Sequence, residues 1–160
     1  MTKKIKRFSD LLTAILLANF AGILGSYATM SGIDSWYSFL QKPFLNPPGW
    51  IFGPVWTLLY VLMGIASFLI YEKAWKKEAG RKALKIYVFQ LILNSLWSII
   101  FFGLQQPFFA FMELIILWLA ILWTILSFYK ISKAAAYLLL PYIAWVSFAA
   151  YLNLSIAILN

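Results

Sequence analysis

Five long apolar runs divide the sequence, and each is close to the ~20 residues that a helix needs to cross bilayer hydrocarbon. Backbone groups in lipid must be paired within their own segment, so we predict that each run is a helix. The predicted helices are Leu11–Tyr27, Pro54–Tyr71, Leu84–Leu104, Phe108–Phe128 and Ala134–Ile158. The pattern indicates one integral membrane domain over residues 1–160, an all-α bundle of five transmembrane helices.

The positions of prolines and short polar stretches predict where the helices begin, end and kink. Pro54 is expected in the first turn of the second helix, where its missing N–H costs nothing. Tight hairpins are predicted at residues 103–107 and 129–133. Pro141 lies inside the fifth run and should kink that helix near Tyr137, whose carbonyl loses its partner.

The loop after the first run differs from an ordinary linker. Four prolines restrict the backbone of the first loop, defined as Trp36–Trp56, and aromatic rings crowd it. A flexible linker would be rich in Gly and Ser instead. We predict a structured, stiff lid with rings at the membrane surface; a merely well-anchored loop is the alternative.

Composition narrows the chemistry available to the chain. Hydrophobic residues make up 64% and the mean hydropathy is +0.85, both far above the values of soluble domains. The first run continues without a small-residue exit, which favours a membrane anchor over a cleaved signal peptide. Cysteine and histidine are absent from the sequence, which excludes disulfides, thiol catalysis and the commonest metal ligands and general base. We therefore predict no metal site and no obligatory cofactor.

The net charge of +8 is distributed very unevenly. In a five-helix topology, the segment before the first helix and the second and fourth loops share one face. These three segments hold every basic residue except Lys42. By the positive-inside rule, the N-terminus is predicted to be cytoplasmic, and the first loop and C-terminus external. The charge thus indicates a multi-pass protein of the cell membrane rather than a nucleic-acid-binding protein.

Polar and aromatic residues recur at helical spacing on several runs. These stripes can converge in the outer half of the bundle, below the first loop. They comprise Asn19 and Ser26; Trp56, Tyr60, Met63 and Gly64; Tyr87, Gln90, Asn94, Trp97, Ser98 and Phe101; and Tyr142, Trp145, Ala149, Leu152 and Asn153. Tryptophan at mid-depth is unusual, because indoles favour the membrane interface. The stripes predict a pocket; the alternative is that the asparagines join helices and the tryptophans only pack.

The same residues resemble the TspO/MBR family, which includes the translocator protein or peripheral-type benzodiazepine receptor. The first loop carries Trp36-Tyr37, Lys42-Pro43, Pro47-Pro48-Gly49-Trp50 and Trp56. Matching segments follow at Met63-Gly64, Trp97-Ser98, Leu139-Leu140-Pro141-Tyr142, Phe148-Ala149 and Leu152-Asn153. The resemblance spans essentially the whole chain and suggests a bacterial member.

The resemblance implies a homodimer of five-helix subunits, each with a pocket closed by the first loop. It also implies binding of protoporphyrin IX or related porphyrins and other planar lipophilic ligands, with a role as receptor or carrier in tetrapyrrole handling and stress response. The implied ligand-binding residues are Trp56, Tyr60, Asn94, Trp97, Ser98, Trp145, Phe148 and Ala149. Some bacterial relatives degrade porphyrins in light, which would make Trp56 and Trp145 catalytic. Whether this chain is such an enzyme is left open.

The chain also departs from the animal members of the family. Their cholesterol-recognition segment needs a basic residue after a tyrosine near the C-terminus, and here Lys133 is the last basic residue. Sterol transport is therefore not expected by resemblance. Without histidine or cysteine, a metal-free porphyrin fits better than an axially ligated iron porphyrin.

Glu113 is the single acidic residue well inside a predicted span, and intramembrane acids are functional candidates. It supports a further alternative, a proton-coupled small multidrug exporter. Against that alternative, its position near the end of the fourth helix suggests a carboxylate that is solvated or paired with a polar neighbour.

Small residues repeat every fourth position on the first helix, at Ala14, Ala18, Gly22 and Ser26. Such a seam lets two helices approach closely. Packing within the bundle is the favoured interpretation, with a dimer contact as the alternative.

Overall fold

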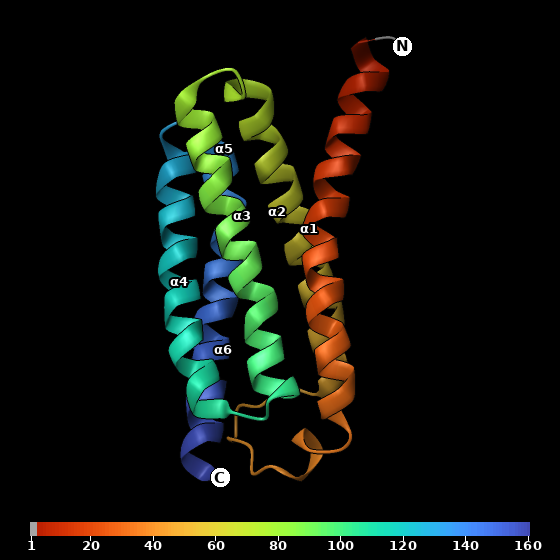
Figure 1. Ribbon diagram of the computed structural model, residues 1–160, viewed down its shortest axis with the longest axis vertical. Coiled ribbons are helices and arrows are strands. Elements are labelled where there is room, and N and C mark those ends of the chain that lie inside the picture. The colour runs from red at the N-terminus through yellow and green to blue at the C-terminus, as the bar shows by residue number, and fades with distance from the viewer. Residues whose placement is uncertain (1–2) are drawn as a thin grey trace.

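The structure, a computed structural model, describes residues 3–160. Within that range it contains helices and no strands, and five helical segments are long and apolar enough to span a membrane. These segments are α1 (Lys3–Ile33), α2 (Phe52–Ala74), α3 (Glu78–Ser98) with the π turn η3 (Ile99–Gly103), α4 (Pro107–Tyr129), and α5 (Lys133–Tyr137) with α6 (Leu140–Leu159). The predicted all-α, five-span membrane fold is confirmed (Figure 1).

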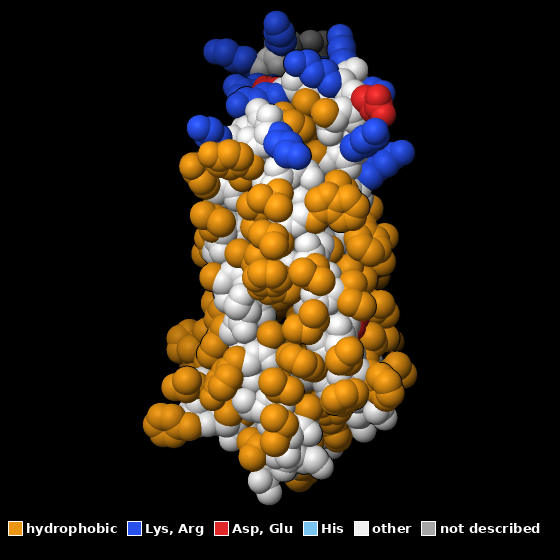
Figure 2. Space-filling model, turned by 90° about the vertical axis from the view of Figure 1, so that its left-hand side faces the viewer, with side chains coloured by type: hydrophobic (Ala, Val, Ile, Leu, Met, Phe, Trp, Pro, Cys, Tyr) orange, Lys and Arg blue, Asp and Glu red, His pale blue; other side chains and the backbone are white. Residues whose placement is uncertain are grey.

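The two ends of the bundle differ sharply in charge. Twelve of the 13 basic residues lie at the end that holds the start of α1, the α2–α3 loop and the α4–α5 connection. Figure 2 shows them gathered above a broad apolar surface. We call this the basic end, and the opposite end, which carries the first loop and the C-terminus, the loop end (Figure 1).

Helix α1 is longer than the predicted Leu11–Tyr27 at both of its ends. Its basic first turns continue the helix beyond the apolar run, because Lys and Arg are good helix formers. At the other end, Thr29 Oγ1 donates to Gly25 O at 3.2 Å and Ser31 Oγ to Ala28 O at 2.7 Å. These hydroxyls are satisfied by the helix itself, so the polar residues do not terminate it.

The last helix is broken where Pro141 predicted a kink. Pro141 has no N–H and its ring would collide with the carbonyl four residues earlier, so α5 ends at Tyr137 and α6 begins at Leu140. The predicted kink is confirmed. It leaves Tyr142 almost fully buried, at 1% exposure, near the start of α6.

Helix α1 crosses from one neighbour to another along its length. Toward the basic end it packs on α2, where a Cβ added to Gly64 would lie 2.5 Å from Ile15 Cα. Toward the loop end it packs on α3, where a Cβ on Gly25 would lie 3.0 Å from Ser98 Oγ. Fully buried Ala18 lies between these regions. Ala14, Ala18 and Gly22 of the small-residue seam thus pack within the bundle, as the favoured interpretation predicted, whereas Ser26 is exposed.

Candidate functional site

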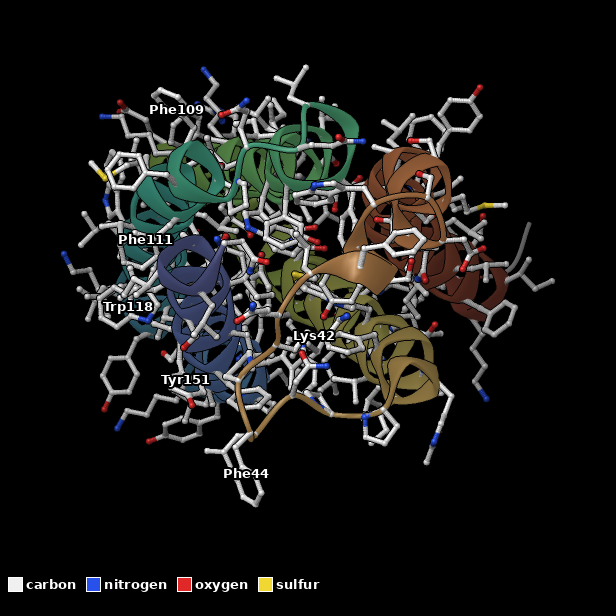
Figure 3. All side chains as sticks on the ribbon, turned by 90° about the horizontal axis from the view of Figure 1, so that it is seen from below. Lys42, Phe44, Phe109, Phe111, Trp118 and Tyr151 are labelled. Carbon is white, nitrogen blue, oxygen red and sulfur yellow. The ribbon has the colours of Figure 1, made fainter. Side chains whose placement is uncertain are left out.

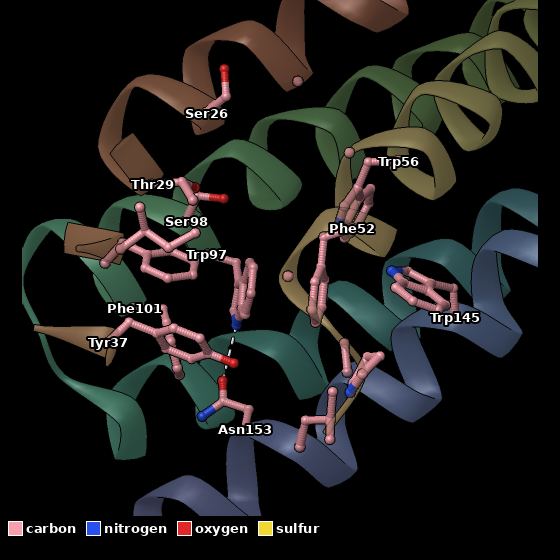
Figure 4. A pocket seen from close by; sticks show the side chains of 18 of the residues that line it. Ser26, Thr29, Tyr37, Phe52, Trp56, Trp97, Ser98, Phe101, Trp145 and Asn153 are labelled. Atoms are coloured by element: carbon pink, nitrogen blue, oxygen red, sulfur yellow. Dashed lines mark hydrogen bonds between the residues drawn. The ribbon is translucent and has the colours of Figure 1, made fainter. Parts of the chain in front are cut away.

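A cavity of about 910 Å³ lies at the loop end, lined by residues of α1, α2, α3, α6 and the first loop. Its volume falls in the range of small-molecule sites, about 300–1,000 Å³. Seven of the eight residues implied by the family resemblance line it: Trp56, Tyr60, Asn94, Trp97, Ser98, Trp145 and Ala149. Figure 4 shows how aromatic side chains from separate elements face this space.

A chain of buried hydrogen bonds joins three helices at the deep end of the cavity. Tyr60 of α2 donates to Asn94 Oδ1, and Asn94 Nδ2 donates to Tyr142 Oη of α6 at 3.0 Å. Tyr142 in turn donates to Gln90 Oε1 at 2.9 Å. All four residues are at most 8% exposed. The network satisfies polar groups that would be costly in hydrocarbon and fixes the rings of the inner wall.

A second polar contact organises the wall nearer the loop end. Trp97 Nε1 donates to Asn153 Oδ1 at 2.9 Å (Figure 4), while Asn153 Nδ2 donates to Pro107 O at 2.7 Å. Asn153 therefore bridges α3 and the first turn of α4 from its place on α6. The Trp97 ring also stacks on Phe101, with centroids 5.3 Å apart. These contacts hold the flat face of Trp97 along the cavity.

The tryptophans opposite Trp97 are held by rings rather than by hydrogen bonds. Trp56 stacks on Tyr60 at 5.7 Å, and Trp145 meets the edge of Phe52 at 5.9 Å. The indole nitrogen of Trp145 is buried and has no hydrogen-bond partner within residues 3–160. In Figure 4 it is turned toward Phe52 and Trp56. A buried N–H without a partner is rare, because it carries a desolvation cost.

The first loop covers the loop end of the cavity and is internally bonded. Tyr37 packs between Phe101 and Phe102 and donates to Asn46 Oδ1 at 3.1 Å. Burial raises the pKa of Tyr37, while its hydrogen bond to Asn46 acts in the opposite direction, so the hydroxyl stays protonated at neutral pH. The ammonium of Lys42 lies 4.7 Å above the Tyr37 ring. These contacts agree with a structured lid.

The C-terminus ties the first loop to α6. Asn160 Oδ1 accepts from Gln41 N at 2.9 Å, and Asn160 Nδ2 donates to Gln41 O at 3.0 Å. Seen from the loop end, the segment with Lys42 crosses the bundle, and the ring of Phe44 points away from it (Figure 3). Phe44 is fully exposed, which suits a ring at the level of lipid headgroups.

The cavity also opens sideways, between α1 and α2. Exposed lining residues stand on both of these helices: Ile23 and Ser26 of α1, and Gly53 and Thr57 of α2. The opening follows from the crossing of the helices. At Gly22, α1 still touches the ring of Tyr60, and beyond it α1 turns toward α3 and leaves α2. The side of the cavity therefore faces the lipid region of the bundle.

Phe148 is the one implied ligand residue that does not line the cavity. Its ring packs against Trp145 at 5.7 Å and against Tyr151 at 6.3 Å, so it supports the wall from outside. The prediction also omitted lining residues of the first loop, among them Tyr37, Asn46 and Phe52. Their aromatic and proline-rich setting marked the segment, but spacing alone did not indicate which side chains turn inward.

Glu113 is buried on α4, at 7% exposure. Neither carboxyl oxygen has a hydrogen-bond partner in the described part of the chain. The expectation of a solvated or paired carboxylate is therefore wrong. Glu113 lies near the loop end of α4, yet its side chain is buried. Glu113 is also absent from the cavity lining, so the structure does not join it to the aromatic site.

Known proteins are similar to this chain in sequence. Residues 14–159 match the TspO/MBR family. The chain belongs to the TspO/MBR family. It is 43% identical to the tryptophan-rich protein TspO of Archaeoglobus fulgidus over 150 residues, which cover 94% of this chain and 96% of that protein.

Other members of the TspO/MBR family carry different names. The translocator protein of Homo sapiens is 43% identical over 123 residues, covering 74% of this chain and 70% of that protein. The tryptophan-rich sensory protein of Cereibacter sphaeroides is 34% identical over 148 residues, covering 91% of each. The matches span bacterial, archaeal and animal relatives.

Proposed function

We propose that this TspO/MBR protein is a membrane receptor or carrier that binds protoporphyrin IX or a similar planar lipophilic molecule in the aromatic cavity. The observation that carries the proposal is the unpaired indole N–H of Trp145, buried among rings that line an apolar cavity. Flat aromatic faces suit a planar ligand. The unpaired N–H is buried beside the Phe52 ring, so it would donate to a polar atom of the ligand once that ring moves aside. The names translocator and sensory protein among its relatives agree with carriage or sensing, here in tetrapyrrole handling and stress response.

Trp145→Ala tests this assignment directly. The variant removes a stacking face and the donor, each worth about 1 kcal/mol, so we expect protoporphyrin IX to bind at least about tenfold more weakly. Quenching of tryptophan fluorescence measures binding to the purified protein in micelles. Trp75→Ala is the matched control, because Trp75 is half exposed at the basic end. Equal effects of the two changes would show that the porphyrin simply partitions into the micelle.

The proposal includes an orientation and an assembly. The twelve basic residues at one end support, by the positive-inside rule, an orientation with that end in the cytoplasm and the first loop and C-terminus external to the cell membrane. The assembly we propose, by family resemblance, is a homodimer. Its partners are then the bilayer, a second copy of the chain and the lipophilic ligand, with no nucleic acid.

A second candidate function is the light-dependent oxidation of the bound porphyrin. It is favoured by the ring contacts of Trp56, which stacks on Tyr60 and meets Tyr142 edge-on at 6.2 Å. Oxidisable rings thus lie in contact beside the cavity. Dioxygen would be the oxidant, and Trp56 and Trp145 would supply electrons or quench radicals while the protein steers the porphyrin's own reactivity.

Illumination separates binding from this chemistry. Trp56→Phe and Trp145→Phe keep a stacking face but are much harder to oxidise. If catalysis occurs, both variants will bind protoporphyrin IX while its absorbance bleaches more slowly than with the unchanged protein. Bleaching no faster than in empty micelles would refute a catalytic role and leave the binding proposal intact.

A further inference from the structure

A second cavity lies at the basic end, far along the bundle from the aromatic site. It measures about 380 Å³ and lies between the first turns of α1 and the last turns of α2. We call it the basic groove; its residues are Lys3, Lys4, Lys6, Arg7 and Asp10 of α1 and Phe68, Tyr71 and Glu72 of α2. Figure 1 shows α1 standing apart from the other helices at this end. The groove follows from the helix crossing at Gly64, beyond which α1 and α2 diverge.

One ion pair closes part of the groove and fixes its geometry. Arg7 Nε lies 2.6 Å from Glu72 Oε1, and a second guanidinium nitrogen donates to Glu72 Oε2 at 3.2 Å. This two-point contact sets Arg7 level with Glu72. Lys3 is then one helical turn farther from the membrane, and Phe68 one turn deeper.

The basic groove is therefore charged at its outer end and apolar at its deeper end. Phe68, at 6% exposure, forms an apolar floor. Tyr71 at the rim packs on Trp75 at 5.2 Å, and both rings are partly exposed. Tyr and Trp in this setting mark the level of lipid headgroups. The lysines stand at and above that level, and the floor reaches toward the acyl region.

The charge in the groove is positive. Four cations line it against the two carboxylates of Asp10 and Glu72, which leaves a net charge of +2. Glu72 is occupied by Arg7, so it competes only weakly for the lysines. An anionic group entering the groove would meet Lys3, Lys4 and Lys6, with the carboxylate of Asp10 as the opposing charge.

We propose that the basic groove binds one anionic phospholipid, with its phosphate among Lys3, Lys4 and Lys6 and an acyl chain against Phe68. Basic pockets between transmembrane helices are suited to anionic headgroups. A lipid also fills the wedge between two diverging helices, which would otherwise be poorly packed. The inference does not depend on the porphyrin proposal or on the side of the membrane that the basic end occupies.

The test compares two triple variants that each remove three positive charges from the basic end. Lys3→Gln/Lys4→Gln/Lys6→Gln changes the groove, and Lys76→Gln/Lys77→Gln/Lys85→Gln changes exposed lysines of the α2–α3 region outside it. The full chain in neutral micelles is titrated with a phosphatidylglycerol and with a phosphatidylcholine of the same acyl chains. Native mass spectrometry counts the retained lipid.

A cation near an anionic lipid contributes a factor of about five, so three should contribute well over tenfold. We expect the groove variant to lose at least about tenfold in affinity for phosphatidylglycerol and the control variant less than about threefold. Both should bind phosphatidylcholine as the unchanged protein does. Equal losses would show diffuse attraction to the whole basic end and overturn the site. Equal affinity for soluble glycerol phosphate would overturn the role of the apolar floor and hence the lipid assignment.

Discussion

Replacing Tyr142 by Phe removes one oxygen from the centre of the buried hydrogen-bond network. The Tyr142 hydroxyl accepts from Asn94 at 3.0 Å and donates to Gln90 at 2.9 Å. Phe keeps the ring and its packing, so the change leaves an amide N–H of Asn94 and the amide oxygen of Gln90 each short of a partner. All three side chains are at most 4% exposed, so bulk water does not reach them readily.

Two kinds of measurement bound the loss of stability that Tyr142→Phe should cause. A buried group left unpaired costs about 1–3 kcal/mol in soluble proteins. Interhelical hydrogen bonds in membranes average only about 0.6 kcal/mol. For two lost bonds we expect a destabilisation of about 2 kcal/mol. A chain of this length then melts about 4–8 °C lower.

Thermal unfolding of the purified protein in micelles measures this change, with Tyr151→Phe as the control. Tyr151 is 44% exposed and lies outside the network. Combining Tyr142→Phe with Asn94→Leu should cost less than the sum of the two single changes, because they break the same bond. An unchanged Tm for Tyr142→Phe, or additive losses in the double variant, would refute the view that this network joins the helices.

Three other predictions address packing, the first loop and topology. Gly64→Ala places a Cβ against the backbone of Ile15 and should lower the unfolding free energy by about 1–3 kcal/mol, whereas Gly53→Ala, with open space at its Cβ, should not; chemical denaturation compares them. Asn160→Ala removes the tie to Gln41 and should speed proteolysis of the first loop severalfold; an unchanged cleavage rate would contradict the tie. A reporter fused after Asn160 should be active only outside the cytoplasm; activity inside would reverse the proposed orientation.

Periodicity and proline predicted the fold because lipid leaves the chain few choices. Each apolar run had to be helical, and the break at Pro141 follows from one missing N–H. The π turn at Ile99–Gly103 was not predictable in the same way. There Leu104 N donates to Ile99 O at 2.8 Å, and Phe101 of the same turn packs against Trp36 and Tyr37 of the first loop, contacts between segments far apart in the sequence.

The candidate site was only partly predictable for a related reason. Trp97 and Asn94 lie on one helical stripe, so their common direction could be deduced from spacing. Phe148 packs on Trp145 and Tyr151 of its own helix, and spacing alone did not show that this face lies outside the cavity. The burial of Glu113 without a partner is a tertiary feature that spacing does not show either. The lining residues of the first loop have no periodicity at all, and their direction is set by contacts such as Tyr37 with Asn46.

The sideways opening between α1 and α2 determines which ligand concentration sets the occupancy of the cavity. A ligand that enters past Ser26 and Thr57 is drawn from the bilayer, not from water. The chemical potential of the ligand is then fixed by the mole fraction of the ligand in the lipid. Diluting the protein with more lipid at constant total ligand would empty the cavity, while adding buffer would leave it filled. For this molecule the membrane is the solvent of the ligand as well as of the helices.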